Sequence, residues 1–105
     1  MKNNYISECP LILDGAMGTE LLRMGVELPL PLWSAVANET CSDMVYKIHH
    51  EYVNAGANVL TTNSFRTTPY AYKKAGFSRR DALLRSEKNL KKAVSIAKKA
   101  LSGTQ

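Results

Sequence analysis

The sequence has few features that would place it in a membrane or in an oxidising compartment. No apolar run approaches the roughly 18 residues of a membrane span, and the first residues lead into no apolar segment of the signal-peptide kind. There are two cysteines, Cys9 and Cys41, and neither lies in a CxxC or other metal-binding spacing. We therefore expect a cytoplasmic protein without a signal peptide, in which both cysteines are reduced and small, buried or half-buried residues.

Acidic residues are also scarce, since nine of them stand against 14 lysines and arginines and leave a net charge of +5. Much of the excess lies in the last segment, at Arg79, Arg80, Arg85, Lys88, Lys91, Lys92, Lys98 and Lys99. No aromatic side chain is interleaved with these residues, so the segment lacks a platform on which nucleic-acid bases could stack. We interpret it as the solvated face of a helix, and we expect neither nucleic acid nor a membrane as a partner.

Several catalytic patterns are missing as well. The sequence has no Gly-rich phosphate loop and no Ser-His-Asp pattern, and Glu39 and Glu51 show no spacing that pairs carboxylates for acid–base work. His49 and His50 are successive residues of a predicted helix, and neither has a His or Cys three or four positions away. From the residues alone we therefore predict no metal site and no catalytic residue in this chain.

What is present is an alternation of short apolar runs with amphipathic segments. Residues 11–13 and 57–62 are predicted to be strands buried on both faces, and 26–40 is predicted to be a loop. Helices are predicted over 19–24, 42–55, 69–75 and 79–101. Ser42, Thr68 and Ser78 are the expected N-caps, and the expected apolar stripe of the longest helix is Leu83, Leu90, Val94, Ala97 and Leu101.

The order strand, helix, strand, helix predicts an α/β fold with a parallel sheet and helices outside it. Two strands cannot complete such a sheet, and their apolar character on both faces requires neighbours. The 105 residues therefore read as the opening of a larger α/β domain. Without those neighbours, residues 11–13 and 59–60 are expected to face solvent or another chain.

Polar groups follow both predicted strands. Asp14-Gly15-Ala16 follows the first strand, and 61–64 ends the second. In parallel α/β folds ligands bind beyond the carboxyl ends of the strands. Asp14 could accept hydrogen bonds from an ammonium group, while the N–H groups of Gly15 and Ala16 could hold a carboxylate, so an α-amino acid would suit the pair. An Asx-type turn with glycine at positive φ is the alternative explanation.

Three stretches together resemble the homocysteine S-methyltransferase family, which includes the homocysteine module of cobalamin-dependent methionine synthase and betaine–homocysteine methyltransferase. They are "ILDGAMGTELLRMG", "PLWSA" and "IHHEYVNAGANVLTTNSFRTTPYAYKKAG", in this order and spacing. The resemblance implies that residues 1–105 are the N-terminal portion of a (β/α)8 TIM barrel, comprising its first two βα units, with the remaining barrel units as expected partners. It further implies zinc-dependent methyl transfer to the thiol of homocysteine, giving methionine.

The resemblance also assigns roles to residues of this chain. Asp14 would take the amino group of homocysteine, and the N–H groups of Gly15 and Ala16 would take its carboxylate. The remaining members of the implied substrate site are Thr62, Asn63 and Phe65 at the same mouth and Trp33, which matches a loop aromatic packed over the methyl donor in some members.

The donor and the metal are implied less completely. The resemblance suggests S-methylmethionine, S-adenosylmethionine or a methylfolate as donor, whereas Arg66 stands where the betaine-using branch has an aromatic residue. The family holds zinc with three cysteines, and neither Cys9 nor Cys41 matches one of them, so the ligands are absent from this chain. The alternative is a non-catalytic module that assembles with other chains or only binds an amino-acid ligand.

Overall fold

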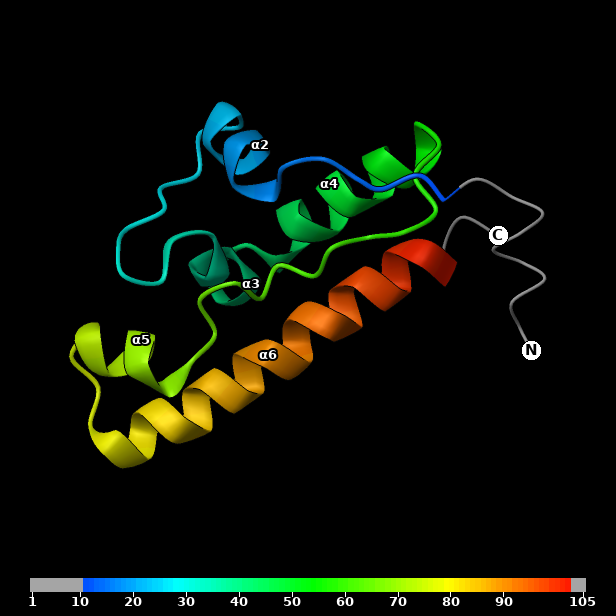
Figure 1. Ribbon diagram of the computed structural model, residues 1–105. Helices are drawn as coiled ribbons and strands as arrows, with labels where there is room; N and C mark the ends of the chain where they lie inside the picture. The colour runs from blue at the N-terminus through cyan, green and yellow to red at the C-terminus, as the bar shows by residue number, and fades with distance from the viewer. Residues whose placement is uncertain (1–10, 103–105) are drawn as a thin grey trace, which may run out of the picture.

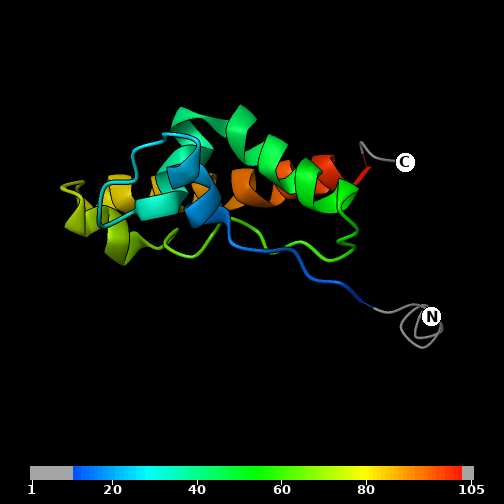
Figure 2. The ribbon, with the colours of Figure 1, turned by 90° about the horizontal axis from the view of Figure 1, so that it is seen from above.

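Helices dominate residues 11–102, the part of the chain that the structure, a computed structural model, describes (Figure 1). In chain order they are α2 (Met17–Arg23), the 3-10 helix η1 (Trp33–Val36), α3 (Ala37–Thr40), α4 (Ser42–Asn54), α5 (Pro69–Lys74) and α6 (Arg79–Ser102). Two extended stretches, one before α2 and one between α4 and α5, run along one side of the helices (Figure 2). Each helix predicted from the sequence is present, and 33–40, predicted to be a loop, is helical.

Two of the three predicted N-caps are confirmed. Thr68 Oγ1 accepts a hydrogen bond from the N–H of Ala71 at 3.1 Å, and α5 then begins at a proline, which needs no N–H in the first turn. Ser78 Oγ accepts from the N–H of Asp81 at 3.2 Å at the start of α6. The prediction for Ser42 is wrong, because Cys41 alone separates α3 from α4 and is itself the N-cap residue, with no side-chain capping bond.

The two predicted strands pair as expected but remain too short to form a sheet. Within residues 11–102 the pairing is a single parallel bridge between Leu13 and Val59. The N–H of Asp14 donates to Val59 O at 3.1 Å, and the N–H of Val59 donates to Ile12 O at 3.1 Å. The first two βα units expected from the sequence are therefore not shown within residues 11–102, because the pairing there is limited to this one bridge.

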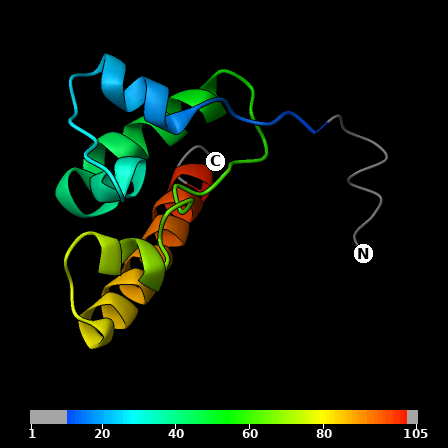
Figure 3. The same cartoon turned by 60° about the vertical axis from the view of Figure 1, so that its left-hand side comes forward.

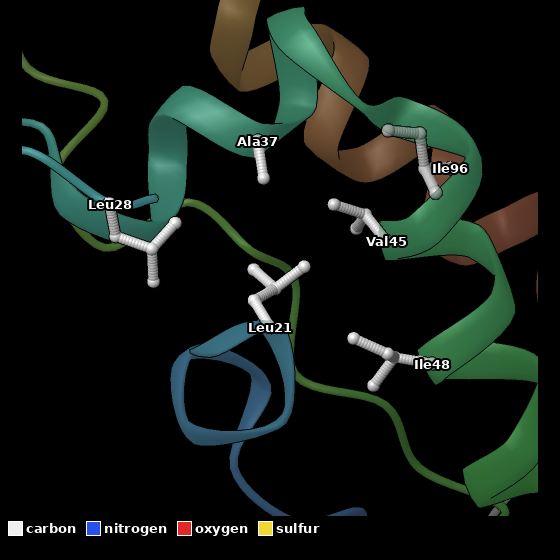
Figure 4. Close-up of a cluster of buried hydrophobic side chains, with 6 residues drawn as sticks. All are labelled: Leu21, Leu28, Ala37, Val45, Ile48 and Ile96. Atoms are coloured by element: carbon white, nitrogen blue, oxygen red, sulfur yellow. The ribbon is translucent and has the colours of Figure 1, made fainter. Parts of the chain in front are cut away.

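The main apolar core lies between α2, α4 and the C-terminal half of α6 (Figure 4). Its buried members are Leu21, Leu28, Ala37, Val45, Ile48 and Ile96. Burying one Leu, Ile or Val side chain contributes about 1.5–3 kcal/mol, so this cluster stabilises the packing of α2 against α4.

The apolar stripe predicted for α6 is wrong at Leu83 and Leu90. The helix buries small and polar residues instead, namely Ala82, Ser86, Asn89, Ala93, Ile96, Ala97 and Ala100. Leu83 is 59% exposed and Leu90 43% exposed, whereas Val94 and Leu101 are half-buried and Ala97 is buried. Small side chains let α6 approach α4 and α5 closely along its length (Figure 3).

Apolar residues of the first extended segment lie on the surface. Leu11, Ile12 and Leu13 are 47%, 48% and 67% exposed, as expected for a double-sided apolar strand without further neighbours. None of the helices within residues 11–102 combines the length and apolar character that crossing a bilayer requires.

We expect the chain to self-associate through this exposed segment, because water-exposed apolar surface next to unpaired backbone groups favours intermolecular pairing. Sedimentation velocity should show association that increases with concentration. Leu13→Gln should weaken it, whereas Lys47→Gln, on the exposed face of α4, should not. A single monomeric species at every concentration would contradict this prediction.

Candidate functional site

A pocket of about 330 Å³ lies where the two extended segments end. It is lined by 14–19, by 33–34 and by four residues of 61–65. The structure brings all seven residues of the predicted substrate site to this pocket: Asp14, Gly15, Ala16, Trp33, Thr62, Asn63 and Phe65. Met17, Gly18, Thr19 and Ser34 also line it and were not predicted from the sequence, whereas Thr61 was placed at the polar end of the second segment but not among the substrate-site residues.

Asp14 joins the ends of the two extended segments. Its Oδ2 accepts a hydrogen bond from the backbone N–H of Thr61 at 3.0 Å, across 47 positions of sequence. A local Asx turn would bond the carboxylate to an N–H two residues further on, so this contact is of another kind. An ionised carboxylate has about four acceptor positions, and the bond to Thr61 uses one of them while fixing the orientation of the group.

The Gly15–Ala16 turn is held from behind by Tyr52 of α4. The Tyr52 hydroxyl donates to Ala16 O at 3.0 Å. A Cβ at position 15 would lie 2.7 Å from the Tyr52 hydroxyl oxygen, so only glycine permits this approach. Burial raises the pKa of Tyr52, and the hydroxyl therefore remains a donor at neutral pH. Sequence reasoning did not identify Tyr52 as a support of this turn.

Trp33 occupies a strained backbone conformation at the pocket wall. Its φ is 51°, in the left-handed region that costs a non-glycine residue of order 1–3 kcal/mol. The indole lies against α2 at Gly18, where an added Cβ would be 2.3 Å from the ring. The backbone on both sides is tied down, since the N–H of Trp33 donates to Pro29 O at 2.9 Å and Ser34 O accepts from Asn63 Nδ2 at 2.8 Å.

The opposite wall comes from the end of the second extended segment. Thr62 Oγ1 and Ser64 Oγ are 2.7 Å apart and hydrogen-bonded. Phe65 is 77% exposed at the rim, and the guanidinium of Arg66 lies 5.3 Å from its ring centroid. Asn63 lines the pocket, but its side chain is buried and its amide group bonds to Ser34 and Asn38.

His49 is buried in α4, and neither of its ring nitrogens forms a hydrogen bond with the described residues. Burial lowers the pKa of His49, and the negative charge of Asp14 offsets part of that effect. The ring is therefore neutral at pH 7. Both histidines lie in α4, as the sequence predicts for a helix over this segment, and His49 faces the interior.

The residues that could hold a metal do not converge. Among residues 11–102, no group of three or more His, Cys, Asp or Glu side chains is arranged to hold a metal ion. Cys41 is half-buried, packs against the main core and lies outside the pocket lining. Cys9 lies outside the described residues.

Known proteins resemble the chain along most of its length. The model of the family "Homocysteine S-methyltransferase" matches residues 11–105. Homocysteine S-methyltransferase 2 of Arabidopsis thaliana is 37% identical over 85% of this chain and 26% of that protein. Homocysteine S-methyltransferase 3 of Zea mays is 39% identical over 86% of this chain and 25% of that protein. Selenocysteine Se-methyltransferase of Brassica oleracea var. italica is 36% identical over 87% of this chain and 25% of that protein.

A solved structure shares the arrangement of the chain. The crystal structure of the homocysteine methyltransferase MmuM from Escherichia coli, in its metallated form, superposes with a TM-score of 0.81 at 29% identity. The superposition covers 96% of this chain and 34% of that one. The chain spans about a quarter of the length of the curated relatives it matches.

The burial of His49 predicts a pH-dependent stability. Because its pKa is lowered in the folded state, the unfolded chain binds the proton more readily, and the free energy of unfolding should fall as pH drops below about 6.5. His49→Leu should remove this part of the slope, and His50→Gln should leave it in place. Urea denaturation between about pH 5 and 8 measures the effect. Equal slopes in the wild type and in His49→Leu would show that another group is responsible.

Proposed function

The chain belongs to the homocysteine S-methyltransferase family, and we propose that its pocket holds homocysteine for the transfer of a methyl group to the thiol, giving methionine. The observation that carries this proposal is that one pocket of about 330 Å³, at the carboxyl end of the parallel pair, is lined both by the Asp14 carboxylate, which the N–H of Thr61 holds in place, and by the glycine-containing turn that directly follows it. The two groups that every α-amino acid presents have opposite charges, and this wall offers an acceptor for one and N–H donors for the other.

In this arrangement Asp14 accepts hydrogen bonds from the ammonium group of homocysteine, and the N–H groups of Gly15 and Ala16 donate to its carboxylate. Tyr52 and Thr61 hold these groups in place before the ligand arrives, which reduces the ordering cost of binding. Thr62 and Phe65 line the side of the pocket toward which the thiol extends. The pocket would recognise the amino-acid end of the acceptor, and this suits a family whose members are named for both sulfur and selenium acceptors.

The resemblance implies zinc, whose chemistry when bound is to deprotonate the thiol at neutral pH. The described residues do not fit that role, because Cys41 lies outside the pocket and no three-ligand group is present among residues 11–102. In this proposal the chain binds and orients homocysteine, and none of its described residues acts at a metal.

We also propose that the two parallel segments are the first two βα units of a (β/α)8 barrel. Two of eight units make a quarter of such a barrel, and the chain spans about a quarter of its curated relatives. Sites in these barrels lie at the carboxyl ends of the strands, where the pocket is found here. The exposed apolar residues 11–13 would then pack against the further units.

For the methyl donor, the candidates are S-methylmethionine, S-adenosylmethionine and a methylfolate, with Trp33 packing over the donor. Arg66 places a cation beside Phe65, and a cation there disfavours a quaternary ammonium such as betaine. The second candidate function is binding of an amino-acid ligand without catalysis, which the absence of a three-ligand metal group from residues 11–102 favours.

Replacing Asp14 by Asn tests the proposed function. The amide can still accept from Thr61, so folding stability should change little. The charge-assisted bond to the ammonium group is lost, and such bonds contribute about 1.5–3 kcal/mol. Homocysteine affinity, measured by isothermal titration calorimetry, should therefore fall roughly 10- to 150-fold.

A carboxylate close by serves as the control. Glu20 lies in α2 outside the pocket lining and forms an exposed ion pair with Arg23 at 2.7 Å. Glu20→Gln should leave homocysteine affinity unchanged. If Asp14→Asn binds homocysteine as tightly as the wild type, the carboxylate has a purely structural role and the proposed site is misplaced.

A further inference from the structure

We propose that Asn89, which lies on α6 outside the substrate pocket, is a positioning residue that fixes the Trp33 turn and the Asn63 wall in their binding geometry. This inference rests on the proposed function for its effect on homocysteine. Its structural part, the control of the Trp33 turn, can be tested without any ligand.

The network starts at the pocket. Asn63 Nδ2 donates to Ser34 O at 2.8 Å and to Asn38 Oδ1 at 3.1 Å, so both hydrogens of its amide are used inside the protein. The Asn63 side chain therefore does not offer these donors to a ligand. It links the end of the second extended segment, which forms one pocket wall, to the backbone carbonyl of Ser34, the residue after Trp33.

Asn38 of α3 carries the network inward. Its Nδ2 donates to the backbone oxygen of Asn63 at 2.7 Å and to Oδ1 of Asn89 at 2.7 Å. Asn38 and Asn63 thus bond to each other in both directions, side chain to backbone and side chain to side chain. Both are buried, so a missing partner could not be replaced by bulk water without opening the structure.

Asn89 closes the network from the far side. Its Nδ2 donates to Ala35 O at 3.0 Å and to the Tyr72 hydroxyl at 2.7 Å, and the Tyr72 hydroxyl donates to Glu39 Oε2 at 2.7 Å. Burial, helped by the bond to Glu39, raises the pKa of Tyr72 to about 12, so its hydroxyl stays protonated at neutral pH. The acceptor and both donors of the Asn89 amide are therefore occupied.

The two backbone oxygens held by this network, those of Ser34 and Ala35, belong to the residues that follow Trp33. A backbone conformation as rare as that of Trp33 persists only where its surroundings determine it more than once. Asn63 and Asn89 supply two such constraints from different elements. Replacing Asn89 removes the hydrogen bond to Ala35 O directly. It also weakens the bond from Asn63 to Ser34 O, because Asn38, which holds Asn63, loses its acceptor on Asn89.

Trp33 is the single tryptophan of the chain, and its fluorescence therefore reports on this turn alone. Asn89→Leu keeps a side chain of similar size and removes the amide. The matched control is Ser86→Ala on the same buried face of α6, because the Ser86 hydroxyl bonds only within its own helix, to Leu83 O at 3.1 Å.

Both variants should lose stability to urea, but only Asn89→Leu should shift the Trp33 emission to longer wavelength in the folded state. Its affinity for homocysteine should also fall by about tenfold, the equivalent of 1.4 kcal/mol, with Ser86→Ala unchanged. A folded Asn89→Leu protein with wild-type emission and wild-type affinity would overturn the proposal.

The outcomes separate this inference from the proposed function. If neither the wild type nor either variant binds homocysteine but the emission shift is confined to Asn89→Leu, the proposed function fails and the positioning role of Asn89 stands. If Asn89→Leu does not fold, side-chain amide NMR of the wild type decides. The Asn63 amide protons should then exchange slowly with solvent, and rapid exchange would refute the network.

Discussion

Three buried asparagine side chains must find hydrogen-bond partners in the interior, and this requirement ties the elements of the structure together. Asn38, Asn63 and Asn89 come from α3, from the segment after α4 and from α6, and they satisfy one another across 25 and 51 positions of sequence. A buried amide left without partners would cost about 1–3 kcal/mol, so α6 cannot rotate or slide without breaking the set. The apolar core stabilises the packing of the helices, and the hydrogen-bonded amides fix how the helices are aligned along one another.

This requirement explains which parts of the fold were open to prediction. Helix starts such as Thr68 and Ser78 depend on local chemistry and were read correctly, as was the direction of pairing between the two apolar runs. The buried face of α6 was read wrongly, because periodicity selected leucines such as Leu83. The face that packs inward is chosen by Asn89 and by small residues that permit close approach, and its partners lie far away in sequence.

The pocket residues likewise divide into those that could be predicted from the sequence and those that could not. Asp14, Gly15 and Ala16 could be named as candidates because they follow a predicted buried strand, where parallel α/β folds bind ligands, and because the family resemblance points to the same residues. Tyr52 and Gly18 escaped notice, since their part in the pocket depends on contacts across 36 and 15 positions, with Ala16 and with Trp33. The residues expected to touch the substrate were thus more accessible to sequence reasoning than the residues that support them.

The contact between Gly18 and the indole of Trp33 has a consequence for how sequences with this pocket can diverge. A Cβ at position 18 would lie 2.3 Å from the ring, so the two positions share one volume. A larger residue on the helix can be accepted only together with a smaller one in the turn. The pair should therefore covary, with glycine accompanying tryptophan and bulkier helix residues accompanying compact turn residues, and an exchange at one position alone would pass through an intermediate of lower fitness.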